Sequence, residues 1–137
     1  MINRLLLFTL ILSHASFLPA ESIVCQIKPE VDFSKPLSSK FFKLEKSMAL
    51  NETNDFSLKV NGEFEGIPLQ NIGIVRSQKG RIILGASLEK HPIEEGFQTH
   101  VVAIPSSHIS DYKFHILFSE LETQCPKTKS FYINFGT

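Results

Sequence analysis

The chain has 137 residues, and its 14 Lys and Arg residues balance 14 Asp and Glu residues, so the formal net charge is zero at pH 7. Because no run of like charge appears, neither a nucleic acid nor an anionic membrane surface is an expected partner. This length provides one domain with one hydrophobic core and argues against a multidomain protein.

Residues 1–20 have the pattern of a secretory signal peptide. Arg4 supplies a positive charge, Leu5–Leu12 form an apolar run, and small residues follow. We expect cleavage after Ala20, with Ala15 as the alternative. The apolar run is shorter than the roughly 20 residues that a membrane-spanning helix needs. The mature protein is therefore expected to be secreted or periplasmic, without a stable membrane anchor.

The two cysteines of the chain, Cys25 and Cys125, predict one disulfide bond. An even number of cysteines in an exported protein favours a bridge, and their wide separation excludes a CxxC redox motif. We predict a single domain over residues 21–137, in which this bridge joins the first strand to the strand before the last.

The first predicted strand is Ser22–Lys28, which is apolar and β-branched and ends at Pro29. The segment Lys40–Leu50 fits both a helix and a strand, because its apolar residues recur at both spacings. We prefer a strand that forms a hairpin with the next one through the polar loop Asn51–Asp55.

Phe56–Asn61 alternates between apolar and polar residues, which predicts a strand with one buried face. The pair Asn61-Gly62 predicts a type I′ hairpin turn, in which both central residues need a positive φ. The returning strand is expected at Glu63–Glu65, and Gly66 suggests a bulge.

A second hairpin is predicted from Asn71–Ser77 and Arg81–Leu88, which flank the turn Gln78–Gly80. Within it, the continuous apolar run Ile82–Leu84 predicts a central strand covered on both faces. Lys90–Gly96 is expected to be a polar loop.

The remaining chain contains three more predicted strands. Phe97–Ile104 is stopped by Pro105, and Ser106–Asp111 forms a turn. Tyr112–Cys125 begins with a clear strand, and Ser130–Phe135 closes the chain with another. Apolar residues at alternate positions of the last two strands are expected to share a face within each strand: Tyr112, Phe114, Ile116 and Phe118 in one, and Phe131, Ile133 and Phe135 in the other.

Eight or nine short strands predict an all-β fold: a small antiparallel β-sandwich or a barrel of about eight strands, preceded by the signal-peptide helix. An immunoglobulin-like arrangement is possible, because a bridge between an early and a late strand occurs there. Against it, the chain has no tryptophan, and Thr123 stands where that arrangement has tyrosine.

Four histidines follow the signal peptide: His91, His100, His108 and His115. None of their spacings matches a zinc or copper motif, so we expect neither a metal site nor a cofactor. His100 and His115 are the weak candidates, because both fall in the middle of predicted strands that follow one another in sequence.

Signals for catalysis are equally sparse. No GxSxG motif occurs, and the predicted disulfide occupies both cysteines. Glu63 and Glu65 share a strand face, as do Glu120 and Glu122, but a catalytic carboxylate pair also needs a cleft. We therefore favour a non-catalytic role over an enzymatic one.

Twelve phenylalanines, with no tryptophan and two tyrosines, are expected to fill the core. The leading hypothesis is an exported binding module whose loops or edge strand contact a protein or a glycan, as an inhibitor or adhesion module would. The alternatives are a carrier of a small apolar ligand in a phenylalanine-lined interior and a histidine-based metal protein or hydrolase. Asn51 begins an N-glycosylation triplet, which matters only in a eukaryotic protein.

Overall fold

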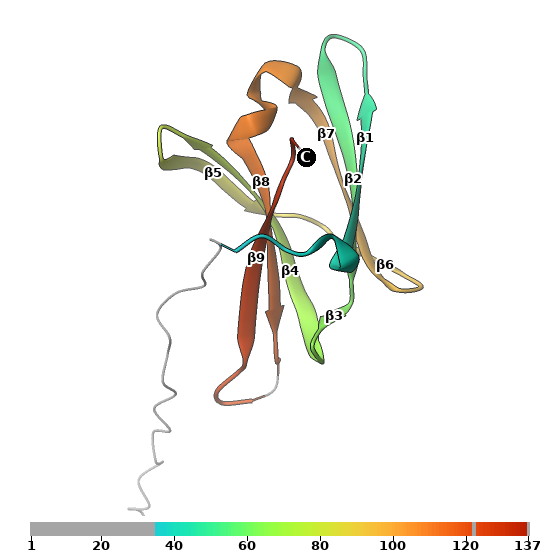
Figure 1. The fold of residues 1–137 in the computed structure, drawn as a ribbon, viewed down its shortest axis with the longest axis vertical. Helices are drawn as coiled ribbons and strands as arrows, with labels where there is room; N and C mark the ends of the chain where they lie inside the picture. The colour runs from blue at the N-terminus through green and yellow to red at the C-terminus, as the bar shows by residue number, and fades with distance from the viewer. Residues whose placement is uncertain (1–34, 122, 137) are drawn as a thin grey trace, which may run out of the picture.

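The computed structural model describes residues 35–121 and 123–136, which form two sheets of mainly antiparallel strands (Figure 1). The first sheet has the strand order β1–β2–β7–β6. The second has the order β3–β4–β8–β9, and β5 also pairs with β4. The all-β fold class predicted from the sequence is confirmed.

The first sheet consists of β1 (Phe42–Met48), β2 (Thr53–Asn61), β6 (His91–Ile93) and β7 (Gly96–Pro105). The second consists of β3 (Glu63–Phe64), β4 (Ile67–Gln78), β5 (Arg81–Ser87), β8 (Tyr112–Ser119) and β9 (Thr128–Asn134). Two short 3-10 helices, η1 (Ser39–Phe41) and η2 (Ser106–Asp111), precede β1 and β8.

One hydrophobic core receives side chains from both sheets. Successive side chains of a strand point to opposite faces, so every second residue of β2 and of β8 is buried. The shared buried face predicted for β8 is confirmed. Its members are Tyr112, Phe114, Ile116 and Phe118.

Phenylalanine side chains hold the two sheets together. The ring of Phe135, which follows β9, stacks on Phe114 with a centroid separation of 4.2 Å. It also contacts Phe56 of β2 at 4.7 Å. A second group packs around Phe64, whose ring lies 4.8 Å from Phe41 and 4.7 Å from Phe131. The phenylalanines thus fill the space between the sheets by packing against one another.

Within the segment Lys40–Leu50, Phe42–Met48 form strand β1, so the preferred strand assignment is confirmed for these residues. β1 pairs with β2 in a hairpin, and Met48 lies opposite Asn54. Two turn residues, Asn51 and Glu52, have positive φ values of 65° and 55°.

The hairpin predicted at Asn61-Gly62 is wrong. Both edges of β2 are occupied, one by β1 and the other by β7, so the chain after Asn61 crosses to the second sheet. The turn with two positive φ values lies instead at Glu65 (50°) and Gly66 (81°), between β3 and β4. Local turn preference was overridden by the pairing of distant strands.

The hairpin predicted around Gln78–Gly80 is confirmed. Lys79 and Gly80 have φ values of 49° and 74°, and β4 and β5 extend from this turn. The loop expected at Lys90–Gly96 contains a short strand, β6, which pairs with the start of β7. Gly96 ends that turn at a φ of 150°, and a Cβ there would collide with the Val60 carbonyl oxygen.

A short extended segment lies along the outer edge of β9. Pro36 forms a parallel bridge with Tyr132. The Leu37 amide donates to the Tyr132 carbonyl at 2.9 Å, and the Tyr132 amide donates to the Lys35 carbonyl at 2.9 Å. The outer edge of β9 is therefore occupied at its centre.

Several sequence-based predictions concern residues outside the described part of the chain. They are the signal peptide over 1–20, the strand at 22–28 and the cysteine at position 25, and they stay predictions. Within residues 35–121 and 123–136, no helix is long and apolar enough to cross a membrane.

Candidate functional site

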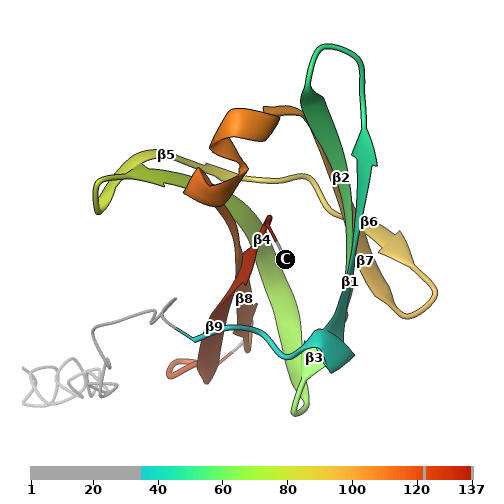
Figure 2. The same cartoon turned by 45° about the horizontal axis from the view of Figure 1, so that its top comes forward.

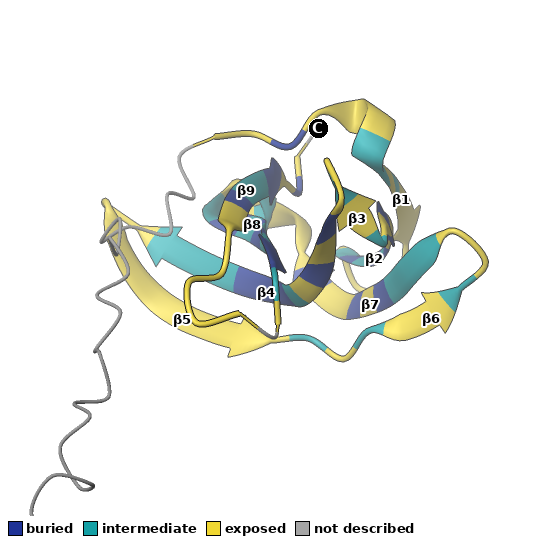
Figure 3. Cartoon of the chain, turned by 90° about the horizontal axis from the view of Figure 1, so that it is seen from below, coloured by how far each residue is buried: buried dark blue, intermediate teal, exposed yellow. Residues whose placement is uncertain are grey.

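Strand β5 carries the most unusual surface of the described residues. Ile82, Ile83 and Leu84 are 69%, 51% and 47% exposed, and all seven residues of β5 are exposed. Figure 3 shows the exposure along the whole strand, and Figure 2 shows the β4–β5 hairpin projecting away from the rest of the second sheet. The prediction that Ile82–Leu84 form a central, covered strand is wrong.

β5 is an edge strand. It pairs with β4 on one side, and among the described residues no strand pairs with its other side. Backbone N–H and C=O groups along that side are available to another extended chain, so an exposed apolar edge is a template for strand addition. Sequence alone missed this site, because a continuous apolar run is typical of covered strands.

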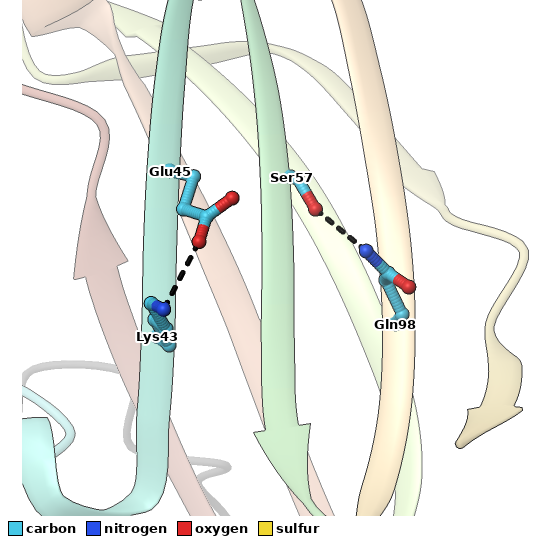
Figure 4. Close-up of polar contacts among 4 residues, drawn as sticks. All are labelled: Lys43, Glu45, Ser57 and Gln98. Atoms are coloured by element: carbon cyan, nitrogen blue, oxygen red, sulfur yellow. Dashed lines mark hydrogen bonds and ion pairs between the residues drawn. The ribbon is translucent and has the colours of Figure 1, made fainter.

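The other edge strands have features that discourage strand addition. On β1, Lys43 Nζ lies 3.1 Å from Glu45 Oε1 (Figure 4), and a hydrogen bond from Lys43 lowers the pKa of Glu45. β6 has three residues, including Pro92, and β3 has only two. β9 is hydrogen-bonded to the segment at Pro36. Charges, proline and covered edges all block pairing.

The hairpin that carries β5 is basic at its tip. Lys79 and Arg81 are exposed there, and residues 77–88 contain no acidic residue. Arg76, further along β4, is half-buried, with its Nε 3.8 Å from Asp111 Oδ2. The exposed positive charge therefore comes from Lys79 and Arg81 at the tip. This charge favours an acidic group on any molecule that binds along β5.

A shallow hollow of about 270 Å³ lies beside β5 and extends over β4 toward β8. Its floor includes Gly73 and Gly85, which carry no side chain. Polar groups line it as well, from Asn71, Ser87 and His115. Burial is the main cause that lowers the pKa of His115, and the charge of Lys113 adds to it.

A second hollow, of about 340 Å³, is lined by residues of β1, β2 and β7, including Glu45, Asp55 and His100. Gln98 Nε2 donates to Ser57 Oγ at 2.8 Å on this sheet (Figure 4). His100 thus lies on the first sheet and His115 on the second, and the fold does not bring this pair together. Among the described residues, no three His, Cys, Asp or Glu side chains form a group that could hold a metal ion.

The remaining candidate residues lie at the surface. Glu63 and Glu65 are exposed at the β3–β4 turn, Asn51 is exposed in the β1–β2 turn, and Cys125 is exposed in the loop between β8 and β9. The predicted partner of Cys125 is outside the described residues, so the disulfide stays a prediction.

The comparisons with known proteins give no further guide to the site. No protein-family model, curated protein or solved structure matches this chain.

Proposed function

We propose that this chain is an exported, non-catalytic binding module, a small β-sandwich that docks an extended segment of a partner protein along the free edge of β5. The observation that carries the proposal is the exposure of three consecutive large aliphatic side chains on an edge strand. Soluble proteins normally protect such edges, so an unprotected one is a candidate for strand addition.

The chemistry of β5 favours a protein over a glycan. Its large exposed apolar side chains are aliphatic, and its free edge offers backbone hydrogen-bonding groups in the pattern of a strand. A docked segment would alternate its side chains across the sheet and carry an acidic residue near Lys79 and Arg81. The carrier alternative has less support, because the phenylalanine rings pack against one another.

A displayed library of random peptides tests this proposal. The peptides should be about ten residues long, the upper end of ordinary strand length. Selection on the wild-type protein is expected to yield alternating apolar sequences with an acidic residue near one end. Ile83→Lys should abolish their binding, because an edge lysine opposes strand addition. In the wild type, peptide binding should shift the amide NMR signals of β5.

Val102→Lys is the matched control, since Val102 is 68% exposed and lies on β7 of the other sheet. It should bind the selected peptides as the wild type does. Equal binding to Ile83→Lys and wild type would overturn the proposal, and so would failure to select any peptide. A dimer that Ile83→Lys disrupts would overturn it as well, because a second copy would then occupy the edge.

A further inference from the structure

The hollow beside β5 has a floor made by two strand glycines. Gly85 of β5 lies opposite Val75 of β4, and Gly73 of β4 lies opposite both Ser87 of β5 and His115 of β8. A Cβ added at Gly73 would lie 3.8 Å from the Cβ of His115, so these positions share one face of the sheet. Gly85 is exposed, so its missing side chain leaves backbone open to solvent, whereas Gly73 is buried and its missing side chain allows close packing against Ala86.

An aromatic side chain on a neighbouring strand can cover a strand glycine and stabilise the pairing, an arrangement known as aromatic rescue. The described part of the chain has no strand beyond β5 to supply one. A segment docked on β5 would place one residue directly opposite Gly85, on the same face of the sheet. The Cβ of that residue would lie about 5 Å from the position that a Cβ at Gly85 would occupy. From there a ring can extend over Gly85 toward Val75 and Gly73, because diagonal neighbours about 7–8 Å apart are within reach of aromatic side chains.

The size and lining of the hollow suit one ring. Its volume of about 270 Å³ is below the smallest ordinary ligand pockets, which measure about 300 Å³. Asn71, Ser87 and His115 line it together with the glycines. A ring with a polar group, tyrosine or tryptophan, can bury its apolar part over the glycines and keep a hydrogen bond at its polar end.

Resting on the proposed docking at β5, we infer that the docked segment carries an aromatic residue opposite Gly85, whose ring covers the glycine floor of this hollow. Backbone pairing along β5 provides general affinity, and the hollow selects which segments bind. The residue that sets this selectivity is Gly85.

Gly85→Val tests the inference without disturbing the fold. A Cβ at Gly85 would meet no atom within 4 Å, and no positive φ restricts the position. Ala86→Val is the matched control. Ala86 also borders the hollow, but its side chain projects from the other face of the strand, so the added β-branched side chain should not fill the hollow. Folding of both variants is checked by circular dichroism and thermal unfolding.

Peptides selected on the wild type should share a tyrosine or tryptophan at a fixed distance from their acidic residue. Replacing that aromatic residue by alanine is expected to weaken binding to the wild type and to Ala86→Val about 10-fold. For Gly85→Val the same replacement should weaken binding less than about 2-fold, because the added side chain already fills the hollow.

Two outcomes separate this inference from the proposed function. Peptides that require Ile83 but show no shared aromatic residue would overturn the aromatic site and leave docking at β5 standing. An aromatic-to-alanine effect of equal size in the wild type and Gly85→Val would do the same. Peptides that bind Ile83→Lys as well as the wild type would overturn both.

Discussion

His115 shows how one half-buried side chain connects stability to pH. Its pKa lies below the ordinary value of 6.5, because partial burial disfavours the charged imidazolium and Lys113 repels it. The unfolded chain therefore binds this proton at a higher pH than the folded protein. As the pH falls through 6.5, the free energy of unfolding should decrease; above 6.5 both states are neutral and the effect is absent.

We predict that His115→Gln reduces this loss of stability on acidification. The measurement is urea-induced unfolding of both proteins above and below pH 6.5. The other histidines are present in both proteins, so the difference between them isolates position 115. Equal losses of stability in the two proteins would contradict the depressed pKa.

At the scale of the secondary-structure elements, the position of one turn can be tested with two glycines. Gly66 has a φ of +81°, which alanine adopts only with strain, whereas a Cβ at Gly62 would make an ordinary 3.6 Å contact with the Cα of Gly96. Gly66→Ala should therefore lower the free energy of unfolding by about 1–2 kcal/mol, and Gly62→Ala should leave it unchanged or slightly raised. Denaturant unfolding measures both. The opposite order would place the turn at Asn61-Gly62.

Elements with strict alternation were predictable from sequence, and elements defined by distant pairing were not. β2 and β8 alternate over their buried residues, and each was predicted with the correct face toward the core. The turn at Asn61-Gly62 failed because β1 and β7 occupy both edges of β2. A local sequence pattern cannot report which strands compete for an edge.

The candidate site was missed for a related reason. A run such as Ile82–Leu84 fits a central strand whose side chains are buried on folding. It fits equally well an edge strand whose side chains are buried only when another chain binds. The hollow depends on Gly73 and Gly85, which are brought near each other only by the pairing of β4 with β5. His100 and His115 were paired as candidates because their predicted strands follow one another in sequence. That order does not determine the sheet to which each strand belongs.

At the scale of the whole molecule, the described residues bear on the disulfide predicted between Cys25 and Cys125. The segment at Pro36 runs parallel to β9, so Lys35 lies toward the end of β9 where Thr128 begins the strand. The loop that contains Cys125 precedes Thr128 and lies at that same end. Lys35, the first described residue, therefore lies at the same end of β9 as Cys125.

Cys125→Ser is expected to lower the free energy of unfolding by about 2–5 kcal/mol, because the bridge restricts the unfolded chain. Denaturant unfolding of the wild type with and without a reducing agent provides the control, and reduction should produce a loss of similar size. Identical unfolding curves with and without the reducing agent would contradict the bridge.

The segment at Pro36 also determines how many partners the second sheet can accept. With β9 already hydrogen-bonded at Tyr132, the sheet can be extended at β5 but is obstructed on the opposite side. A sheet open at both sides can recruit molecule after molecule and grow into a fibre, whereas one with a single open side stops after the first addition. The backbone hydrogen bonds that hold residues 35–37 would therefore keep any assembly through β5 finite, with one docked segment for each molecule.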